Sequence, residues 1–497
     1  MRRENRSSGG LAIGVSPRRG AAYTETIMDV RNPRTGQRHN RIDATTSGDL
    51  SIVCRELKKA QPAWAARSWE ERVAVLETWV AAVSADADVL SALSVDTGRH
   101  RLAVGEISGV SFALSQWARF AAEVFAAQPS RPLAADSDVT YTTRLFSYPL
   151  VGVISPWNFP LLLSLLDSLA ALVAGSAVVV KPSEITPRFI APLQKLIDAS
   201  PELSPVFRFV IGDGSIGAEL INNVDTVCFT GSVATGKKVA AAAAENMIPA
   251  HLELGGKDPV IVLASADVQQ AAISILRASV QATGQACQSL ERVYVARSIY
   301  PEFLQALTSE AERVELNAAD ISDGHLGPII MEAQAAIIAG QVNAAVEAGA
   351  KRLTGGKVEN HNGGLWIRPT VLTEVTHDMD IIKAETFGPV LPVIAFDTQE
   401  QAIAFANDSE YGLSAAVFGE EAEATAVGVQ INAGAISIND GGLTAIAFEA
   451  EKDSHGLSGL GRSRMGTTGL TRFLRKKAIL TRHAGGVGID SLREHRD

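Results

Sequence analysis

The strongest constraint on the fold is a regular alternation of short apolar segments and helical segments that begins at Val151. Apolar segments occur at 151–154, 177–180, 208–211 and 226–229. Between them, segments 162–174, 188–199 and 216–222 have the apolar spacing of a helix. This alternation predicts an α/β fold in which a parallel sheet is covered by helices on both faces. It resumes after Val260, with strands expected at 293–295, 391–394 and 435–438, so we predict a second α/β domain.

The remaining segments suggest how the chain is divided. With 497 residues, 46% of them hydrophobic, the chain is long enough for two or three domains. Residues 1–27 are interpreted as a disordered tail, with a transit peptide as the alternative, because they are rich in arginine and lack the apolar core of a secretory signal. We expect a turn at 31–36, helices from 49 to about 128, and a strand or hairpin at 138–147.

The most apolar stretch, 161–180, is about long enough to span a bilayer. Asp167 lies inside it, and Gly175-Ser176 divides it into a helical half and a Val-rich half. We therefore interpret it as a buried helix followed by a buried strand, and we expect no association with a membrane.

Charge and cysteine content exclude several classes of partner and site. The net charge of −10 argues against nucleic acid and anionic membranes. Cys54, Cys228 and Cys287 are widely spaced and odd in number, so they form no disulfide framework and suit a reducing cytoplasm. The nine histidines form no ligand-spaced cluster with cysteine, so we predict no metal site.

Two segments carry residues that suit covalent catalysis: Glu253 in the sequence LELGGK and Cys287 in GQAC. An ionised thiol is the strongest nucleophile among the side chains, and a carboxylate can activate the water that releases the product. Each residue also has an ordinary interpretation, since most lone cysteines are small buried hydrophobic residues and most glutamates are surface charges. On these two segments alone the ordinary interpretation is favoured.

Two glycine patterns resemble phosphate-binding loops. Residues 212–217 match G-x-G-x-x-G between a strand and a helix, where a dinucleotide pyrophosphate can approach a helix N-terminus. Residues 231–238 nearly match the phosphate loop of nucleotide hydrolases, but Lys238 stands where a Ser or Thr should bind magnesium. Gly231-Ser232 still precedes an Ala-rich helix whose first amides can bind a phosphate. Either pattern is also compatible with an ordinary glycine turn.

Taken together, the motifs resemble those of the aldehyde dehydrogenase superfamily, in its hydrolytic, NAD(P)-dependent branch, from about Val30 to Gly466. Each motif is weak alone, but six in the family's order are specific. They are Pro156-Trp157-Asn158-Phe159-Pro160, Lys181-Pro182-Ser183-Glu184, Phe229-Thr230-Gly231-Ser232, Glu253-Leu254-Gly255-Gly256-Lys257, Gly284-Gln285-Ala286-Cys287 and Glu385-Thr386-Phe387-Gly388-Pro389.

The resemblance implies a role for each motif. Cys287 attacks the aldehyde carbon, Asn158 stabilises the oxyanion together with the backbone N–H of Cys287, and Glu253 activates water to hydrolyse the thioester. The implied cofactor is NAD, with NADP as the alternative. Within the two glycine patterns, the family places the pyrophosphate at Gly231-Ser232. The candidate cofactor contacts are Ser155, Pro156, Trp157, Lys181, Ser183, Glu184, Gly214, Gly217, Gly231, Ser232, Leu254, Gly255, Glu385 and Phe387.

The family fold also implies a division of the chain. A Rossmann-like NAD-binding domain comprises 28–128 and 149–252, and an α/β catalytic domain comprises 253–440. Segments 129–148 and 472–482 form a small β oligomerisation element, and 441–471 returns toward the cofactor domain and the substrate tunnel. Arms of this kind extend a neighbour's sheet, so a homodimer or homotetramer is expected.

The chain departs from the family pattern in two places. Asp167 lies where many relatives carry a basic or aromatic residue, and 448–456 replaces much of a Pro-Phe-Gly-Gly-x-Lys-x-Ser-Gly segment. The expected tunnel lining is mostly apolar and has no arginine pair for a substrate carboxylate, so an aliphatic or aromatic aldehyde is expected. That lining comprises 111–117, 161–165, Ala286, Gln288 and part of 444–448.

Four functions are compared. We predict an NAD-dependent aldehyde dehydrogenase that releases a free carboxylic acid. The rival is a CoA-acylating semialdehyde dehydrogenase, which does not need the base Glu253. Lys238 argues against a phosphate-loop ATPase. A structural protein on the same fold, such as a lens crystallin, often lacks the catalytic residues, whereas Cys287, Asn158 and Glu253 are all present here.

Overall fold

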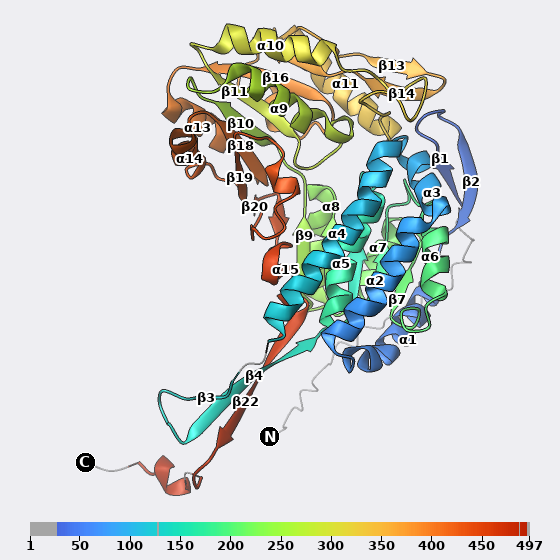
Figure 1. The fold of residues 1–497 in the computed structure, drawn as a ribbon, viewed down its shortest axis with the longest axis vertical. Helices are drawn as coiled ribbons and strands as arrows, with labels where there is room; N and C mark the ends of the chain where they lie inside the picture. Colours follow the sequence, from blue (N-terminus) through green and yellow to red (C-terminus); the bar gives the residue numbers. More distant parts are fainter. Residues whose placement is uncertain (1–26, 127–128, 487, 495–497) are drawn as a thin grey trace, which may run out of the picture.

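Two largely parallel sheets form the body of the molecule, and a long two-stranded ribbon projects from it (Figure 1). The computed structural model describes residues 27–126, 129–486 and 488–494. The tail expected at 1–27 lies, except for Ile27, outside the described residues. The fold class predicted from the sequence is confirmed, because both sheets are built from strands connected by helices.

The first sheet has six strands in the order β21-β9-β8-β5-β6-β7, and only the edge strand β21 runs antiparallel to its neighbour. Every residue of the central strands β5, β6 and β8 is buried, as expected for a parallel sheet covered on both faces. The strands are β5 (Leu150–Ile154), β6 (Ala177–Lys181), β7 (Phe207–Phe209), β8 (Thr226–Thr230), β9 (Ala250–Glu253) and β21 (Gly459–Leu460).

The four strands expected between Val151 and Phe229 are therefore present. β5, β6 and β8 each extend one residue beyond the expected range, and β7 differs more. The expected strand 208–211 is β7, which ends at Phe209. The N–H of Ile211 donates to the side chain of Thr45 at 3.0 Å rather than to a strand, so the ladder stops earlier than the apolar residues do.

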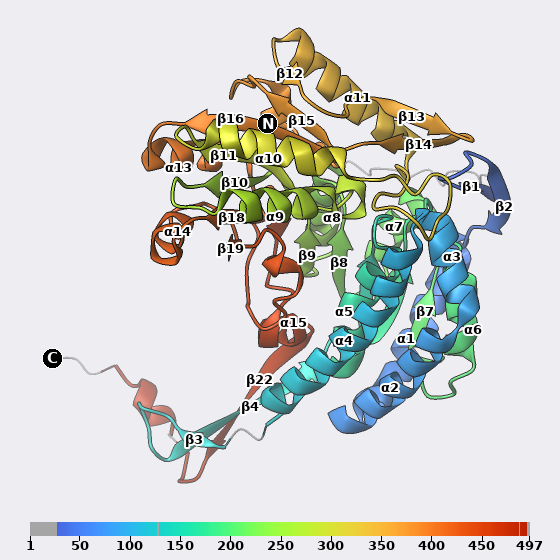
Figure 2. The same ribbon diagram turned by 45° about the horizontal axis from the view of Figure 1, so that its top comes forward.

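Helices cover this first sheet, and the α4 helix packs along α5 (Figure 2). The helices are α1 (Ser47–Ala65), α2 (Trp69–Ala85), α3 (Ala87–Thr97), α4 (His100–Val124), α5 (Pro160–Ala174), α6 (Ile190–Asp198), α7 (Gly214–Ile221) and α8 (Val233–Glu245). The helical pattern expected from Asp49 onward corresponds to α1–α4.

The apolar stretch 161–180 forms helix α5 and strand β6, as predicted. Pro160 occupies the first turn of α5, where its missing N–H costs nothing, and Gly175 ends the helix with φ of 99°. Nearly all of α5 is buried between the sheet and its neighbouring helices. Among the described residues, no helix has the length and apolar character required to cross a bilayer.

The second sheet has seven strands in the order β12-β15-β16-β11-β10-β18-β19, antiparallel only at β12. Alternate residues of one strand enter different cores: Val260 and Val262 contact one cluster, whereas Ile261 contacts the other. The strands are β10 (Asp258–Val262), β11 (Leu290–Ala296), β12 (Lys351–Arg352), β15 (Thr370–Thr373), β16 (Val390–Phe396), β18 (Ser414–Phe418) and β19 (Ala435–Ile438), so the three strands expected after Val260 are confirmed.

Helices α9 and α10 cover one face of this sheet, and α13 and α14 cover the other. The helices of this half are α9 (Val268–Val280), α10 (Tyr300–Glu312), α11 (Glu332–Glu347), α12 (Asp380–Lys383), α13 (Gln399–Asn407) and α14 (Glu421–Gly428). Short 3₁₀ segments are η1 (Gln281–Gly284), η2 (Leu443–Ala445) and η3 (Ile489–Leu492).

The projecting ribbon pairs β22 (Leu474–Arg482) with β4 (Val139–Ser147) along its whole length, and β3 (Arg131–Pro132) lies on the other side of β4. This agrees with the strand expected at 138–147. Three small antiparallel pairs complete the strands: β1 (Ile27–Arg31) with β2 (Arg38–Asp43), β13 (Val358–His361) with β14 (Gly364–Ile367), and β17 (Tyr411–Gly412) with β20 (His455–Gly456).

The C-terminal segment returns to the first sheet and is fastened there by a buried ion cluster. Before the ribbon, helix α15 (Gly466–Thr471) packs against α4 and α5. Asp167 on α5 accepts from Arg464 at 2.9 and 3.1 Å and also pairs with Arg472. Although burial opposes it, the two guanidinium charges keep the pKa of Asp167 below its usual value. The acidic residue at position 167, which differs from the family pattern, is thus neutralised by Arg464 and Arg472.

Candidate active site

The sequence motifs converge where the chain passes from the first sheet to the second. Strand β9 of the first sheet ends at Glu253, and strand β10 of the second begins only a few residues later, at Asp258. The motifs beginning at Ser155, Lys181 and Gly231 each lie at the carboxyl end of a strand of the first sheet. In parallel α/β sheets this edge is where ligands bind.

Cys287 follows a tightly bent segment after α9. Ala282, Thr283 and Gly284 have φ of 53°, 61° and 69°, so the helix cannot continue. A Cβ on Gly284 would lie 2.2 Å from the backbone carbon of Gly388, so only glycine allows these two motifs to approach so closely. The buried side chain of Gln285 fixes the loop by donating to two backbone carbonyls and accepting from a third residue's N–H.

Asn158 is joined directly to this loop. The side-chain Nδ2 of Asn158 donates to the backbone carbonyl of Gln285 at 2.9 Å. The guanidinium of Arg99 donates to the backbone carbonyl of Asn158 at 2.7 Å. An amide nitrogen carries two N–H groups, so one remains for a ligand beside Cys287. Asn158 is buried, and its Oδ1 has no partner among the described residues.

Charged groups surround the thiol of Cys287. Although the residue keeps some solvent exposure, burial of the thiol raises its pKa to about 12. The negative charges of Asp258, Glu385 and Glu253 act in the same direction, and the positive charge of Lys452 opposes them. Glu253 and Glu385 therefore lie close enough to Cys287 to influence its ionisation.

Glu253 is partly exposed at the end of β9. Its carboxylate accepts from Ser454 Oγ at 3.4 Å, and its carbonyl accepts from the N–H of Gly231 at 3.1 Å. The backbone of Glu253 is thus bonded to Gly231, just before α8. Its side chain contacts Ser454, in the segment 448–456 that differs from the family pattern. Leu254, the next residue, donates its N–H to the carbonyl of Ser458 at 2.9 Å.

Lys181 connects the first glycine pattern to the end of β6. Its Nζ donates to Glu184 at 3.2 Å and to the carbonyl of Gly212 at 2.7 Å. Gly217 lies beside it, since a Cβ there would be 3.6 Å from Lys181 Cδ, whereas Gly214 has open space around it. Both members of the pattern therefore lie at the same sheet edge as Lys181.

The second glycine pattern starts α8 in the way an anion site requires. Ser232 is the N-cap residue, and its Oγ accepts from the N–H of Thr235 at 3.4 Å. At Gly231 a Cβ would lie 2.7 Å from the ring of Phe229. The remaining N–H groups of this first turn have no intrahelical acceptor, as at every helix start.

The other candidate cofactor residues surround this edge. Ser155 Oγ bonds Ser164 Oγ at 2.6 Å, and Pro156 follows it directly. The ring of Trp157 lies 5.4 Å from that of Phe387, edge to face. Ser183 Oγ accepts from the N–H of Ile185 at 3.3 Å, a local turn contact.

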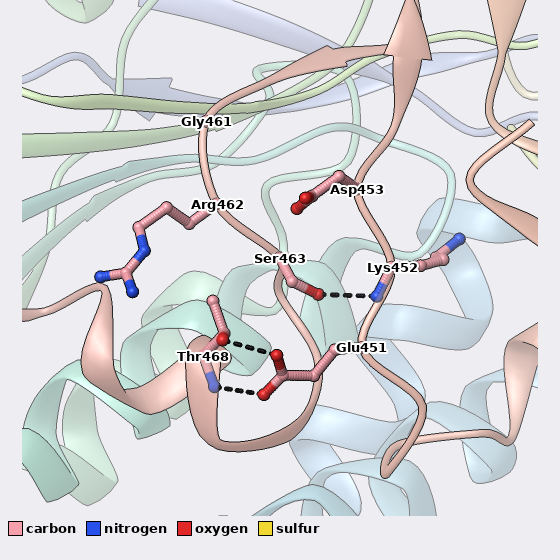
Figure 3. A pocket seen from close by; sticks show the side chains of 7 residues that line it. All are labelled: Glu451, Lys452, Asp453, Gly461, Arg462, Ser463 and Thr468. Carbon is pink, nitrogen blue, oxygen red and sulfur yellow. Dashed lines mark hydrogen bonds between the residues drawn. The ribbon is translucent and has the colours of Figure 1, made fainter.

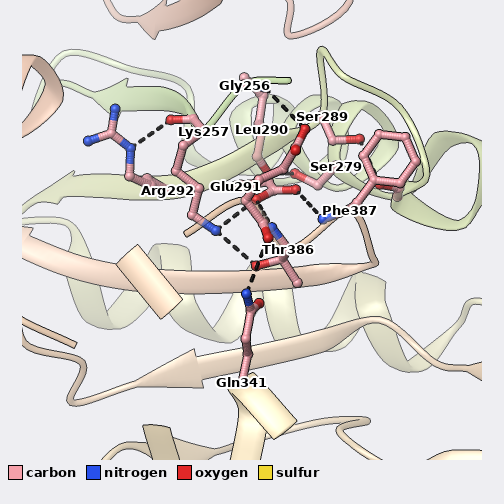
Figure 4. A network of polar contacts seen from close by, with 12 residues as sticks. Gly256, Lys257, Ser279, Ser289, Leu290, Glu291, Arg292, Gln341, Thr386 and Phe387 are labelled. Atoms are coloured by element: carbon pink, nitrogen blue, oxygen red, sulfur yellow. Dashed lines mark hydrogen bonds and ion pairs between the residues drawn. The ribbon is translucent and has the colours of Figure 1, made fainter. Parts of the chain in front are cut away.

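Glu385 belongs to a polar network that the sequence motifs did not predict. Figure 4 shows the centre of this network, where Glu291 lies among Lys257, Thr386 and Phe387. The Oε1 of Glu385 accepts from the N–H of Gly256 at 3.1 Å, and its carboxylate lies against Gly255, where a Cβ would be 2.4 Å from Oε2. Burial, reinforced by the charge of Glu291, raises the pKa of Glu385 to about 8.

Glu291 is the residue that organises this network. It is buried, pairs with Lys257 Nζ at 2.7 Å, and accepts the N–H groups of Thr386 and Phe387 at 2.8 Å each. It thereby fixes the loop that carries Glu385 and Phe387. The sequence gives one indication of this network: two adjacent residues of opposite charge, Glu291 and Arg292, occur inside an otherwise apolar strand.

The expected tunnel residues also meet. The ring of Phe448 lies 5.5 Å from that of Phe112 and 5.8 Å from that of Trp117, and Thr444 Oγ1 donates to Gln288 at 3.0 Å. Next to this segment is a cavity of about 310 Å³ (Figure 3). It is lined by Glu451, Lys452, Asp453, Gly461, Arg462, Ser463 and Thr468.

Within the described residues, no three His, Cys, Asp or Glu side chains are grouped as a metal ion would require. The three cysteines are free thiols.

Comparisons with known proteins agree with this geometry. The family model described as Aldehyde dehydrogenase family matches residues 20–479. A protein of Mycobacterium bovis named "Putative succinate-semialdehyde dehydrogenase", with NADP(+) in its name, is 34% identical, and the alignment covers 93% of this chain and 89% of that protein.

Solved structures give the same result. A putative aldehyde dehydrogenase, PutA, of Anabaena variabilis has a TM-score of 0.91 and 48% identity, covering 93% of this chain and 99% of that one. Betaine aldehyde dehydrogenase of Staphylococcus aureus in complex with NAD+ has a TM-score of 0.86 and 28% identity, covering 94% and 93%. The chain belongs to the aldehyde dehydrogenase family, oxidoreductases that act on the aldehyde group.

Proposed function

We propose that this protein oxidises an aldehyde to the free carboxylic acid through a thioester on Cys287 that is hydrolysed by water activated by Glu253. The observation that carries the proposal is the bond of 2.9 Å from Asn158 Nδ2 to the carbonyl of Gln285. It places an amide donor beside the loop that carries Cys287, which is partly exposed, whereas Cys54 and Cys228 are buried. A nucleophile next to an oriented donor is the arrangement that acyl transfer requires.

The residues at the sheet edge fit a nicotinamide dinucleotide. Helix α8 presents its first amides behind Ser232, which suits a pyrophosphate. Lys181 and Glu184 offer a donor and an acceptor for ribose hydroxyls, and the carboxylate of Glu385, beside Gly255, offers a further acceptor. When bound, NAD supplies the hydride acceptor.

The protein's own groups perform the remaining steps. The thiolate of Cys287 forms the S–C bond, and the carbonyl π pair becomes an oxyanion that Asn158 Nδ2 and the N–H of Cys287 stabilise. Loss of hydride restores the carbonyl as a thioester. Glu253 then takes a proton from water, the hydroxyl adds to the thioester, and the thiolate leaves with the acid as product.

A panel of aldehydes tests this function. Aliphatic, aromatic and carboxylated aldehydes are supplied with NAD or NADP, and reduced cofactor is followed by absorbance while the product is identified by mass spectrometry. Free acid formed without CoA supports the proposal. A product that appears only as acyl-CoA would favour the CoA-acylating alternative, and no oxidation of any aldehyde would reject both.

We predict a preference for NAD over NADP, with kcat/KM about ten-fold higher or more. Glu184 lies beside Lys181 at the expected ribose position, and its negative charge would repel a 2′-phosphate carrying nearly two negative charges. The NADP named for the mycobacterial relative makes this comparison informative. Glu184→Gln should lower the NAD to NADP ratio, whereas Glu202→Gln, also a surface glutamate, should leave it unchanged. A native preference for NADP would reject the assignment.

The projecting ribbon supports a proposal about assembly. β22 exposes Ile479 and Leu480, and β4 exposes Phe146, on an element that leaves the body of the molecule (Figure 1). We propose that this ribbon pairs with a second copy in a homodimer or homotetramer. Light scattering coupled to gel filtration should give two or four times the monomer mass, and a purely monomeric species would reject the proposal.

We further propose the division of the chain that the family implies: a cofactor domain at 28–128 and 149–252, a catalytic domain at 253–440, an oligomerisation element at 129–148 and 472–482, and a returning segment at 441–471. The change of sheet between Glu253 and Asp258 and the separate ribbon support it. The three free thiols support a reducing, cytoplasmic location.

A further inference from the structure

Arg99 lies directly before helix α4 and is buried against the segment that carries Asn158. Its Nη2 donates to the backbone carbonyl of Asn158 at 2.7 Å. Its guanidinium carbon also lies 5.7 Å from the ring centroid of Phe159, the next residue. Arg99 therefore contacts two consecutive residues of this segment and fixes the peptide group that follows the Asn158 side chain.

A second buried residue of the same helix holds the turn that follows. Glu106, two turns along α4, accepts the N–H groups of Leu161 and Leu162 at 3.0 and 3.1 Å. These two N–H groups belong to the first turn of α5, where the helix itself provides no acceptor. Helix α4, which runs along α5 (Figure 2), thus fixes the segment 158–162 at two points, and Arg99 is the one at Asn158.

The other side of the Arg99 side chain faces the second sheet's half of the molecule. Its stem lies against Gly327, where a Cβ would be 2.4 Å from Arg99 Cγ. The carbonyl of Gly327 accepts from Thr283 Oγ1 at 2.9 Å, in the bent segment before Cys287. Arg99 therefore lies between the segment that carries Asn158 and a segment that anchors the loop of the nucleophile.

The guanidinium of Arg99 makes few bonds for a buried charge. Of its five N–H donors, those on Nε and Nη1 are buried and have no partner among the described residues. Arg292, which is also buried, donates to three backbone carbonyls. A buried charge with few partners is costly. Arg99 thus contributes little to stability, and its bond to the carbonyl of Asn158 is the feature that indicates a use.

We propose that Arg99 is a positioning residue for the oxyanion site. By holding the carbonyl of Asn158, it keeps the side-chain amide of Asn158 directed at the aldehyde oxygen when the aldehyde carbon is bound to Cys287. Arg99 acts through Asn158 and not on the substrate. This role rests on the proposed function, in which Asn158 is an oxyanion donor.

The first test is Arg99→Met, which keeps most of the stem and removes every donor. We expect single-turnover NADH formation, with enzyme in excess over aldehyde and NAD saturating, to slow about ten- to a hundred-fold, because a small displacement of a catalytic group can cost that much. Alkylation of Cys287 by iodoacetamide should stay close to the native rate, since the loop of Cys287 keeps its own bond to Gly327.

A double-mutant cycle separates positioning of Asn158 from a general effect on the fold. Alanine at position 158 keeps the backbone carbonyl but has no amide to direct. Adding Arg99→Met to Asn158→Ala should therefore slow single-turnover NADH formation by less than about two-fold further. The matched control is Arg101→Met, which removes an exposed arginine from the first turn of α4 and should leave both assays at native rates.

A native single-turnover rate in the folded Arg99→Met protein would overturn the proposal. A further loss in Asn158→Ala as large as the loss in the native background would also overturn it, because Arg99 would then act independently of that amide. An equal loss in the alkylation assay would assign Arg99 to the loop of Cys287 instead, and the proposal would again be wrong.

If Arg99→Met does not accumulate, Arg99→Gln replaces it in every assay, because glutamine is too short to form the same bond to Asn158. Failure of the proposed function appears separately, as absent oxidation in the aldehyde panel of the native enzyme.

Discussion

Glu253→Gln should give a burst of about one NADH per active site and then nearly stop, with steady-state turnover lowered by about 10²–10⁴-fold. In the proposed mechanism, acylation and hydride transfer need Cys287, whereas release of the acid needs a base for water. Glutamine keeps the size of the side chain and an oxygen that can accept from Ser454, so the fold around the end of β9 should persist. Rapid mixing with absorbance at the NADH band measures both phases.

Three comparisons make the result specific. Cys287→Ala should show no burst, because no thioester forms. Glu245→Gln, at an exposed position near the end of α8, should match the native enzyme in both phases. If Glu253 also helps to ionise Cys287, the burst of the glutamine variant should slow and recover partly at higher pH. Normal steady-state production of free acid would refute the assignment of Glu253 as the hydrolytic base.

The strands of both sheets were predictable because they are buried on both faces. A segment such as 177–180 consists of apolar β-branched residues and a small residue, which excludes an exposed loop, and it forms β6. Asp167 alone did not reveal its environment, since the sequence does not show that Arg464 and Arg472, about three hundred residues away, neutralise it. The boundary of β7 was missed for the same kind of reason, a bond from Ile211 to distant Thr45.

In the candidate site, too, contacts between residues far apart in the sequence could not be predicted. Motif order predicted that Asn158, Glu253 and Cys287 belong to one site, and the structure brings the loops of Asn158 and Cys287 into direct contact. Glu291 belongs to no motif, and its importance depends on burial and on partners from other segments of the chain. A sequence shows which residue types are present, but it does not show whether a charge is paired. That property emerged only from the packing of several segments around Cys287.

Asn158→Ala should slow acylation about 10²–10³-fold while leaving NAD affinity nearly unchanged. The free N–H of Asn158 is expected to bind an oxygen whose negative charge develops only during attack, so its loss acts on the transition state and not on cofactor binding. Single-turnover NADH formation measures acylation, and fluorescence titration measures NAD binding.

The structure adds a requirement to this test, because Asn158 Nδ2 also bonds the carbonyl of Gln285 at 2.9 Å. Alanine could displace the Cys287 loop and slow the reaction for that reason alone. Alkylation of Cys287 by iodoacetamide separates the two effects, since it needs a correctly exposed thiolate but no oxyanion donor. Slow acylation with a native alkylation rate assigns Asn158 to the oxyanion. Equal losses in both assays would make it a packing residue, and a large loss of NAD affinity with unchanged turnover of bound substrate would make it a cofactor contact.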